Sequence, residues 1–321
     1  MVFGGSIRLN KRGYFLIALI ILIFLCFHFG KHPSQEYDNE ISFKELLETA
    51  IQAAEAGGKL VVSTRDHIEI KSKGKTKEGM DDSVTTADFL SHCVMEHIIK
   101  DAFPHVRFIS EETDVPCEKG LIYEMPSKPN LNIEDKFAKL GDVTIWIDPL
   151  DATHEYTEKL YQYVTTMVCV AIKGQPIIGV IHNPFFKTTS WAVVKLGLSP
   201  DLKKNIKSQS KTNTKVIISR SHSGTIKEVL EKNFKNLEVV IAAGAGYKSL
   251  QVANNSVDAY LHITAIKKWD ICAGNAILNA LGGKMTTKYG QVITYFNNTD
   301  VVNKDGVIAT LRYHEMFVNM L

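Results

Sequence analysis

Two aspartates stand three residues apart at the end of an apolar segment, in the stretch "TIWIDPLDATHEYTE" that runs from residue 144 to 158. Pro149 lies between Asp148 and Asp151 and stiffens the backbone there, which keeps the two carboxylates close together. In open α/β sheets, ligands bind just beyond the ends of the strands. The spacing therefore predicts two carboxylates that face a binding site, although aspartates in such a place also make simple turns.

Further acidic residues occupy comparable positions: Asp88 follows "VTTA", Glu111 and Glu112 follow "VRFIS", and Asp270 opens "DICAGNAILNALGG". Each has a simple structural explanation, as a helix N-cap for the two aspartates or as a solvated loop acid for Glu111. Taken together they predict more, because clustered carboxylates repel one another and need a cation. Oxygen-only ligands favour Mg²⁺, Mn²⁺ or Ca²⁺. Such ions can bind a phosphate ester and activate water for its hydrolysis.

The elements expected around these acids follow from the spacing of apolar residues. A helix is predicted to begin after Ser42 and to stop at Gly57 and Gly58, and a second helix to run from Asp88 to just before Pro104. The basic, glycine-containing residues 71–88 are predicted to form a loop, and residues 114–142 a surface excursion. Short apolar runs predict strands at "VRFIS", residues 143–147, "VTTMVCVAIKG", "QPIIGVIHNP" and "TSWAVV".

Beyond residue 214 the pattern alternates between strands and helices. Strands are expected at "KVIIS", "LEVVIAA", "DAYLHI" and "GKMTT", and helices from Thr225, Tyr247 and Asp270. This alternation indicates a layered α/β second half. The polar residues 197–214 are the expected seam, which divides residues 43–212 from a second subdomain at 213–321.

An apolar segment, Tyr14–Gly30, precedes the globular part. It could be a cleaved secretory signal or a short signal-anchor transmembrane helix, and the bulky residues at its end argue against cleavage. Arg8, Lys11 and Arg12 precede it, so residues 1–13 are predicted to stay cytosolic as a short tail, with the body lumenal in a type II topology. Residues 31–42 are then a linker. Sequons at Asn254 and Asn297 predict glycosylation there.

Composition excludes some classes of function. The formal net charge of +2 gives no reason to expect a nucleic acid polymer as a partner. The segment "GAGYK" lacks the third glycine of a dinucleotide-binding fingerprint, so a Rossmann site is rejected. The five cysteines have no CxxC spacing, and buried or unpaired thiols are expected rather than a disulfide framework.

Two motifs in order along the chain suggest a family. "DPLDAT" resembles the DPxDxT motif of the Mg²⁺-dependent, lithium-sensitive phosphatases related to inositol monophosphatase, and "WDICAG" resembles their WDxxAG signature. "VTTAD" and "EET" fall in the family's order, and the resemblance covers roughly residues 43 to 312. It implies a layered α/β/α/β/α sandwich, here preceded by one N-terminal transmembrane helix. Homodimers are common among such proteins.

The resemblance also implies roles for individual residues. Asp88 and Thr153 would together orient and deprotonate the attacking water, and hydrolysis would be in-line without a covalent intermediate. Ala152 replaces the glycine that is common after the second aspartate of the motif. Two or three Mg²⁺ ions would be held by Glu111, Asp148, the Leu150 carbonyl, Asp151 and Asp270.

Further segments suggest the substrate. "HEYTE", "SRSHSG" and "GAGYK" resemble the branch of the family that hydrolyses 3′-phosphoadenosine 5′-phosphate, a 3′(2′),5′-bisphosphate nucleotidase activity that gives AMP and phosphate. With the anchor, this implies a lumenal enzyme on the Golgi membrane that clears a by-product of sulfotransferases. An inositol phosphate or inositol polyphosphate phosphatase is the alternative enzyme, and a binding protein without activity is the non-enzymatic one. The residues expected to contact a nucleotide are Ser219, His222, Gly246 and Lys248.

Overall fold

The computed structural model describes residues 10, 12–15, 17, 19–21, 40–75, 81–112, 116–117, 120–203, 213–220, 226–227, 230, 236–296 and 300–321. The chain divides into two units, residues 1–39 and residues 40–321. Most of the predicted anchor at residues 14–30 lies outside the described residues. Among those that are described, no helix combines the length and the apolar character that a membrane span requires.

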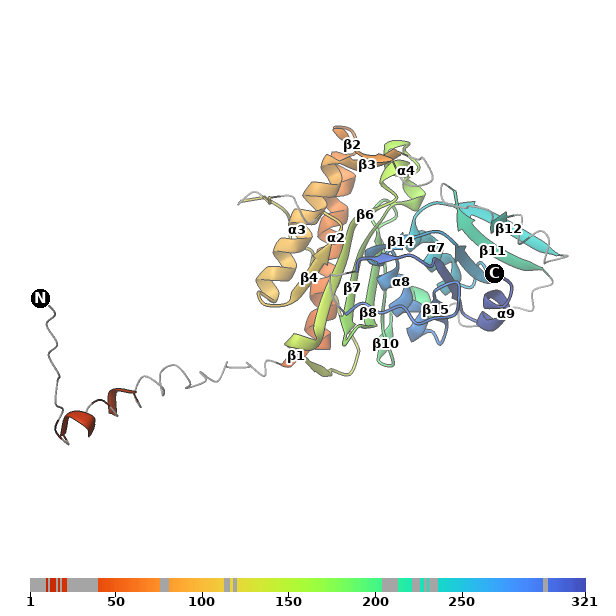
Figure 1. Ribbon diagram of the computed structural model, residues 1–321. Coiled ribbons are helices and arrows are strands. Elements are labelled where there is room, and N and C mark those ends of the chain that lie inside the picture. The colour runs from red at the N-terminus through yellow and green to blue at the C-terminus, as the bar shows by residue number, and fades with distance from the viewer. Residues whose placement is uncertain are drawn as a thin grey trace, which may run out of the picture. The chain divides into compact units, whose positions relative to one another are not determined.

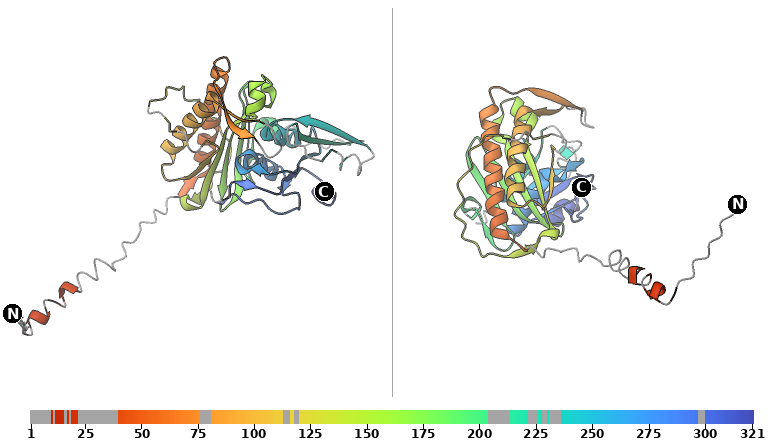
Figure 2. Two further views of the ribbon diagram at one scale, coloured as in Figure 1. Left: turned by 45° about the horizontal axis from the view of Figure 1, so that its top comes forward. Right: turned by 90° about the vertical axis from the view of Figure 1, so that its left-hand side faces the viewer.

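Two long helices form the first layer of residues 40–321. Helix α2 spans Phe43–Thr64, and its N-terminus is capped by Ser42, whose hydroxyl accepts a hydrogen bond from the backbone N–H of Glu45 at 3.1 Å. Helix α3 spans Thr86–Ala102. Both helices lie side by side across one face of a sheet (Figure 2).

The prediction that α2 ends at Gly57 and Gly58 is wrong, because the helix continues to Thr64. Both glycines are places of close approach. A methyl group at Gly57 would lie 2.5 Å from Ser91 Oγ of α3, and one at Gly58 would lie 2.5 Å from His182 Cδ2 of the sheet. The tertiary packing of α2 therefore requires the glycines, and its energy outweighs their low helix propensity.

The sheet under these helices carries the predicted "DPLD" motif. Its strand order is β10-β9-β8-β7-β6-β4, and only β4 and β6 pair in parallel. In that pair Ser110 lies opposite Ile147, so the next residues, Glu111 and Asp148, come at the same end of the two strands. The strands are β4 (Arg107–Ser110), β6 (Val143–Asp151), β7 (Thr165–Ile172), β8 (Gln175–Asn183), β9 (Thr188–Val193) and β10 (Gly197–Leu198).

A second sheet of order β12-β11-β13-β17-β15 lies beyond helices α7 (Ala245–Ala253) and α8 (Lys268–Ala280), as Figure 1 shows. The short helix α9 (His314–Val318) packs with this sheet near the C-terminus. The order of helices and sheets confirms the predicted layered α/β/α/β/α sandwich. The strands are β11 (Thr214–Ser219), β12 (Leu237–Ala242), β13 (Ala259–His262), β15 (Lys284–Thr286) and β17 (Val307–Thr310).

Separate apolar cores join these layers. One lies between α2, α3 and the first sheet, and includes Leu47, Met95 and Ile145. The largest core joins both sheets through α8. Its buried side chains are scattered along the sequence between Ile109 and Ala309. Since this core draws on both halves of the chain, the position of the site between the sheets is fixed by buried apolar contacts.

The prediction of a loop over residues 71–88 is wrong where the chain is described. Strands β2 (Ile70–Lys75) and β3 (Asp81–Thr85) pair as an antiparallel hairpin, and α3 begins directly after it. The hairpin is rich in Lys, Ser and Asp, so its sequence lacks the apolar alternation by which a strand is recognised. In the described part of residues 114–142, strand β5 (Phe137–Lys139) pairs with β1 (Glu40–Ser42).

Four of the five cysteines form disulfides, contrary to the expectation of unpaired thiols. Cys93 of α3 is bonded to Cys117, and Cys169 of β7 is bonded to Cys272 of α8. The partners are 24 and 103 residues apart. Pairs at such separations depend on the tertiary fold and leave no local spacing signal.

Candidate active site

The "DPLD" motif forms an irregular end to strand β6. The ladder with β7 is interrupted between Asp148 and Asp151, which lets both side chains leave the regular pleat. The Asp148 carboxylate accepts a hydrogen bond from the backbone N–H of Leu150 at 3.1 Å, and Ser91 of α3 donates to the Pro149 carbonyl at 2.7 Å. Ala152 has a φ of 69°, in the left-handed region that favours glycine.

Asp88 is the third residue of α3 rather than its N-cap, a position that Thr85 fills. One carboxylate oxygen of Asp88 accepts hydrogen bonds from the Thr85 backbone N–H at 2.7 Å and from its hydroxyl at 2.6 Å. The other oxygen lies 2.9 Å from the hydroxyl of Thr153, which also lies 3.0 Å from the Leu150 carbonyl oxygen. The structure thus joins the two residues to which the sequence assigned activation of water.

Asp151 is held by the beginning of helix α7. Its carboxylate accepts hydrogen bonds from the backbone N–H groups of Ala245 at 3.1 Å and Gly246 at 2.8 Å, and from the Thr165 hydroxyl at 3.2 Å. A methyl group at Gly246 would overlap Thr165 Oγ1 and lie 2.7 Å from the sulfur of Met167. Because only glycine fits, α7 can approach Asp151 closely enough for its N-terminal amides to bind the carboxylate.

Asp270 lies in the first turn of α8 and is partly buried, with the backbone N–H of Lys267 3.3 Å from its carboxylate. Two residues later, Cys272 joins the helix to β7 through the disulfide with Cys169. The structure thus brings Asp270 to the carboxylates at the end of β6, although the residues are far apart in the sequence.

The acids that the sequence singled out interact strongly. Burial raises the pKa of Asp148 well above its usual range, and the nearby charges of Glu111, Asp151, Asp270 and Asp88 raise it further. Burial, with a contribution from Asp151, raises the pKa of Asp270 to about 8. Burial also raises the pKa of Asp88 to about 6. Buried carboxylates that destabilise each other's charge and offer only oxygen donors fit a hard divalent cation such as Mg²⁺.

Lys248 lies inside this cluster instead of at its outer edge. The side chain is buried, and its ammonium group lies 5.2 Å from the centre of the Tyr260 ring. Burial lowers the pKa of Lys248 to about 8, while Asp151, Glu155 and Asp270 act in the opposite direction. Lys248 therefore offsets part of the negative charge at the base of the site.

The remaining predicted residues are only partly described by the structure. Ser219 ends strand β11, and its hydroxyl lies 3.0 Å from His262 Nδ1. His222 and Asn297 lie outside the described residues, and Asn254 follows the last residue of α7.

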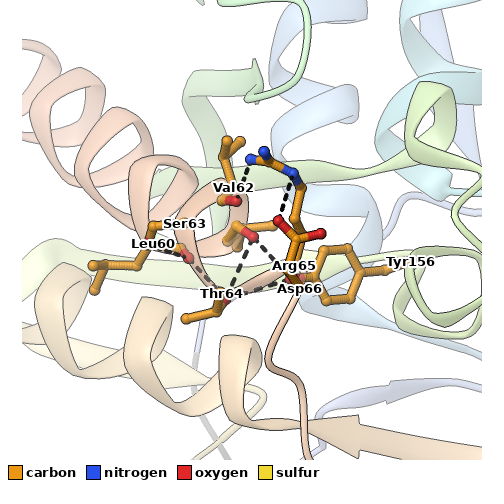
Figure 3. A network of polar contacts seen from close by, with 8 residues as sticks. Leu60, Val62, Ser63, Thr64, Arg65, Asp66 and Tyr156 are labelled. Atoms are coloured by element: carbon orange, nitrogen blue, oxygen red, sulfur yellow. Dashed lines mark hydrogen bonds and ion pairs between the residues drawn. The ribbon is translucent and has the colours of Figure 1, made fainter.

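Helix α4 (Thr153–Thr157) contains most of the "HEYTE" segment and connects the site to its surroundings. The Tyr156 hydroxyl donates to the Val61 carbonyl at 2.8 Å. It also lies 3.4 Å from the Thr64 hydroxyl, at the C-terminal end of α2 (Figure 3). On the other side, Arg220 of the "SRSHSG" segment forms ion pairs with Glu158 at 2.5 Å and with Glu155 at 3.6 Å. Two of the three segments that suggested a nucleotide substrate therefore contact each other.

Sequence reasoning did not single out some residues that position the acids. Thr85 precedes Asp88 by three residues, which is a capping-box spacing and could have been recognised. Thr165, which binds Asp151, gave no such signal, because a threonine in an apolar strand is ordinary. Arg220 likewise has no local pattern that predicts its partners.

Comparisons with known proteins agree with one another. The model of the inositol monophosphatase family matches residues 42–320. The chain is 46% identical over 331 residues to the inositol monophosphatase 3 of Xenopus laevis, which covers 95% of this chain and 92% of that protein. It is 40% identical over 352 residues to the Golgi-resident adenosine 3′,5′-bisphosphate 3′-phosphatase of Mus musculus, covering 98% and 97% of the two chains.

A solved structure described as an IMPase/NADP phosphatase complexed with Mg²⁺ and phosphate has the same fold. Its TM-score is 0.59 at 16% identity, over 82% of this chain and 90% of that chain. The matched residues include every acid at the end of β6 and the first turns of α3 and α8. The chain belongs to the inositol monophosphatase family.

Proposed function

We propose that the chain is a Mg²⁺-dependent phosphatase that removes the 3′-phosphate of 3′-phosphoadenosine 5′-phosphate and releases AMP. The observation that carries the proposal is the convergence of Glu111, Asp151, Asp270 and Asp88 around Asp148. Five acids gathered at one sheet edge, of which Asp88, Asp148 and Asp151 are buried, have little structural value without a cation. The substrate follows from the "HEYTE", "SRSHSG" and "GAGYK" segments and from the name of the relative from Mus musculus.

The side chains of Glu111, Asp148, Asp151 and Asp270, with the Leu150 carbonyl, would hold two or three Mg²⁺ ions. Bound Mg²⁺ would supply a Lewis acid that polarises the phosphate and makes water more acidic. Thr153, held by Asp88, would accept a hydrogen bond from the attacking water, and Asp88 would take up its proton through the threonine hydroxyl.

The nucleotide would lie with its 3′-phosphate against the carboxylates at the "DPLD" end of β6. The backbone N–H of Gly246 holds the Asp151 carboxylate there, and Lys248 contributes a buried positive charge. Ser219 and His222 would contact the substrate from the end of β11.

An inositol phosphate phosphatase is the second candidate, because the relative from Xenopus laevis is named inositol monophosphatase 3. The two functions are separated by measuring phosphate release from both substrate classes with the purified protein, with and without Mg²⁺. We expect release from the nucleoside bisphosphate to be faster and to stop without Mg²⁺. Faster turnover of inositol phosphates would show that they are the preferred substrate. No turnover of either substrate class would favour a binding protein. Lithium is expected to inhibit the reaction by competing for a metal position.

We further propose that the enzyme is tethered to the Golgi membrane by residues 14–30, with residues 31–321 in the lumen. The apolar segment, the positive charges before it and the Golgi-resident name of the relative support this topology. In sealed Golgi vesicles, added protease should digest the body only after detergent is added, and Asn254 or Asn297 should carry a glycan. Digestion without detergent would show that the body faces the cytosol.

A further inference from the structure

A second group of potential metal ligands is formed by two residues of helix α3 and Cys117. Among the residues that the structure describes, His92, Glu96 and Cys117 bring one ligand atom each within 4.8 Å of one another. Cys93, the neighbour of His92, is disulfide-bonded to Cys117 and therefore places a second sulfur beside the group. One imidazole, one carboxylate and two sulfurs are the donor types that tetrahedral zinc sites use.

The distances between these atoms already approach those of a zinc site. His92 Nε2 lies 3.5 Å from Glu96 Oε2, and Cys117 Sγ lies 3.4 Å from the same oxygen. Zinc bonds of about 2.0–2.3 Å in tetrahedral geometry place neighbouring ligand atoms roughly 3.3–3.8 Å apart. The two sulfurs are closer than this only because they are bonded to each other.

The surroundings orient the imidazole and the carboxylate. His92 Nδ1 lies 2.8 Å from the Ser110 hydroxyl, which directs Nε2 toward Glu96. Such a hydrogen bond on the far ring nitrogen is what metal-binding histidines usually make. Lys100 binds the other oxygen of Glu96 at 2.5 Å and offsets its charge.

We propose that His92, Cys93, Glu96 and Cys117 form a zinc site when the Cys93–Cys117 disulfide is reduced. A dithiol reductant transfers two electrons and two protons to the sulfur pair and becomes a cyclic disulfide itself. Zn²⁺ then displaces the two thiol protons and forms two Zn–S bonds, one Zn–N bond and one Zn–O bond. The same residues thus crosslink α3 to Cys117 in either state, by a disulfide when oxidised and by a metal when reduced.

The two disulfides of the chain differ in access, which makes the proposal testable. Cys93 and Cys117 are half-buried. Cys169 and Cys272 are 1% and 0% exposed. Since a reductant must reach a sulfur to attack it, mild treatment of the folded protein should open the Cys93–Cys117 bond selectively.

The test uses the purified full-length protein, treated with dithiothreitol, desalted without oxygen and titrated with Co²⁺ or Zn²⁺. Cobalt bound by thiolates gives a ligand-to-metal charge-transfer absorption that cobalt bound by carboxylates at the β6 site lacks. We expect the reduced protein to show this absorption with cobalt and to bind one additional zinc per chain. We expect the oxidised protein to show neither. Circular dichroism of each sample shows whether it is folded.

Variants assign the ligands. Cys117→Ser should remove the absorption, and Glu96→Gln should weaken cobalt binding about tenfold or more while retaining it. His97→Ala is the matched control, because His97 pairs with Asp101 on the same helix and is not a member of the ligand group. It should bind cobalt like the unmodified chain. Thiolate absorption that survives in folded Cys117→Ser, or equal zinc uptake by oxidised and reduced protein, would overturn the proposal.

Discussion

The hydroxyl of Thr153 lies 2.9 Å from the carboxylate of Asp88, although 65 residues separate them in the sequence. The other oxygen of Asp88 is already bound by both the backbone N–H and the hydroxyl of Thr85. Only the oxygen beside Thr153 therefore remains directed into the site. Burial raises the pKa of Asp88 to about 6, which makes this carboxylate a better base than an exposed aspartate.

Replacing Thr153 by valine tests whether its hydroxyl passes the proton of the attacking water to Asp88, without changing the fold. Thr153→Val keeps the shape of the side chain and removes its hydroxyl, so we expect kcat to fall roughly 10²-fold or more while KM changes little. Thr153→Ser restores the hydroxyl and should recover most of the rate. The measurement is steady-state phosphate release. Equal rates for the serine and valine variants would show that the hydroxyl takes no part.

Asp151→Asn removes one negative charge from the cluster and leaves the volume of the side chain nearly unchanged. The amide would place an NH₂ group against the N–H donors of Ala245 and Gly246, and it is a weaker ligand for a divalent cation. We expect phosphate release to be lost, and the rise in melting temperature on adding Mg²⁺ to be much smaller than in the unmodified protein. The far-ultraviolet circular dichroism should not change.

Asp142→Asn is the matched control for that variant, because Asp142 forms an ion pair with Lys173 near the start of β6, away from the "DPLD" end. It should retain full activity. An Asp151→Asn protein that turns over substrate as fast as this control would contradict the proposed role of the carboxylate.

The sequence predicted the elements whose signals are local. The apolar runs "VTTMVCVAIKG" and "QPIIGVIHNP" correctly placed β7 and β8, and the acids at the ends of apolar strands pointed to one sheet edge. It did not predict features that depend on distant partners. Gly57 and Gly58 look like a helix stop until the contacts with Ser91 and His182 are known.

The candidate site shows the same division. The identities of its acids could be read from motifs, and the structure brings them together, but their roles as ligands stay predictions. The sequence could not indicate that the first residues of α7 lie against Asp151 or that Lys248 lies buried among the acids, because both depend on how the two sheets pack. Electrostatic partners across such a core have no fixed spacing in the chain.

The stability of the metal-free protein should depend on pH in a direction set by Asp270. Its pKa in the folded protein is about 8, against 3.8 in an ordinary aspartate, so the folded chain binds more protons than the unfolded chain between these values. The contribution of Asp270 to stability is therefore fully present below pH 3.8 and is lost as the pH rises through about 8. His182, whose pKa burial lowers to about 4, has the opposite effect, but only up to its ordinary value of 6.5.

The measurement is chemical denaturation between pH 6.5 and pH 8, with EDTA or with Mg²⁺. With EDTA the free energy of unfolding should fall as the pH rises, and the stabilisation by Mg²⁺ should grow over the same range, since the metal competes with protons for the carboxylates. Asp270→Asn should flatten the EDTA curve. An unmodified, metal-free protein that becomes more stable from pH 6.5 to pH 8 would refute the expectation.

Gly246→Ala tests whether the beginning of α7 positions Asp151. The added methyl group would overlap Thr165 Oγ1 and lie 3.2 Å from the Asp151 carboxylate, so α7 has to move away from the acid. We expect a loss of stability of about 1–3 kcal/mol, typical of overpacking, together with a higher Mg²⁺ concentration for half-maximal activity. Gly141→Ala is the control, because a methyl group there meets nothing within 4 Å, and it should change neither quantity. If Gly246→Ala lowered stability but left the Mg²⁺ dependence unchanged, the α7 amides would serve only to pack the helix.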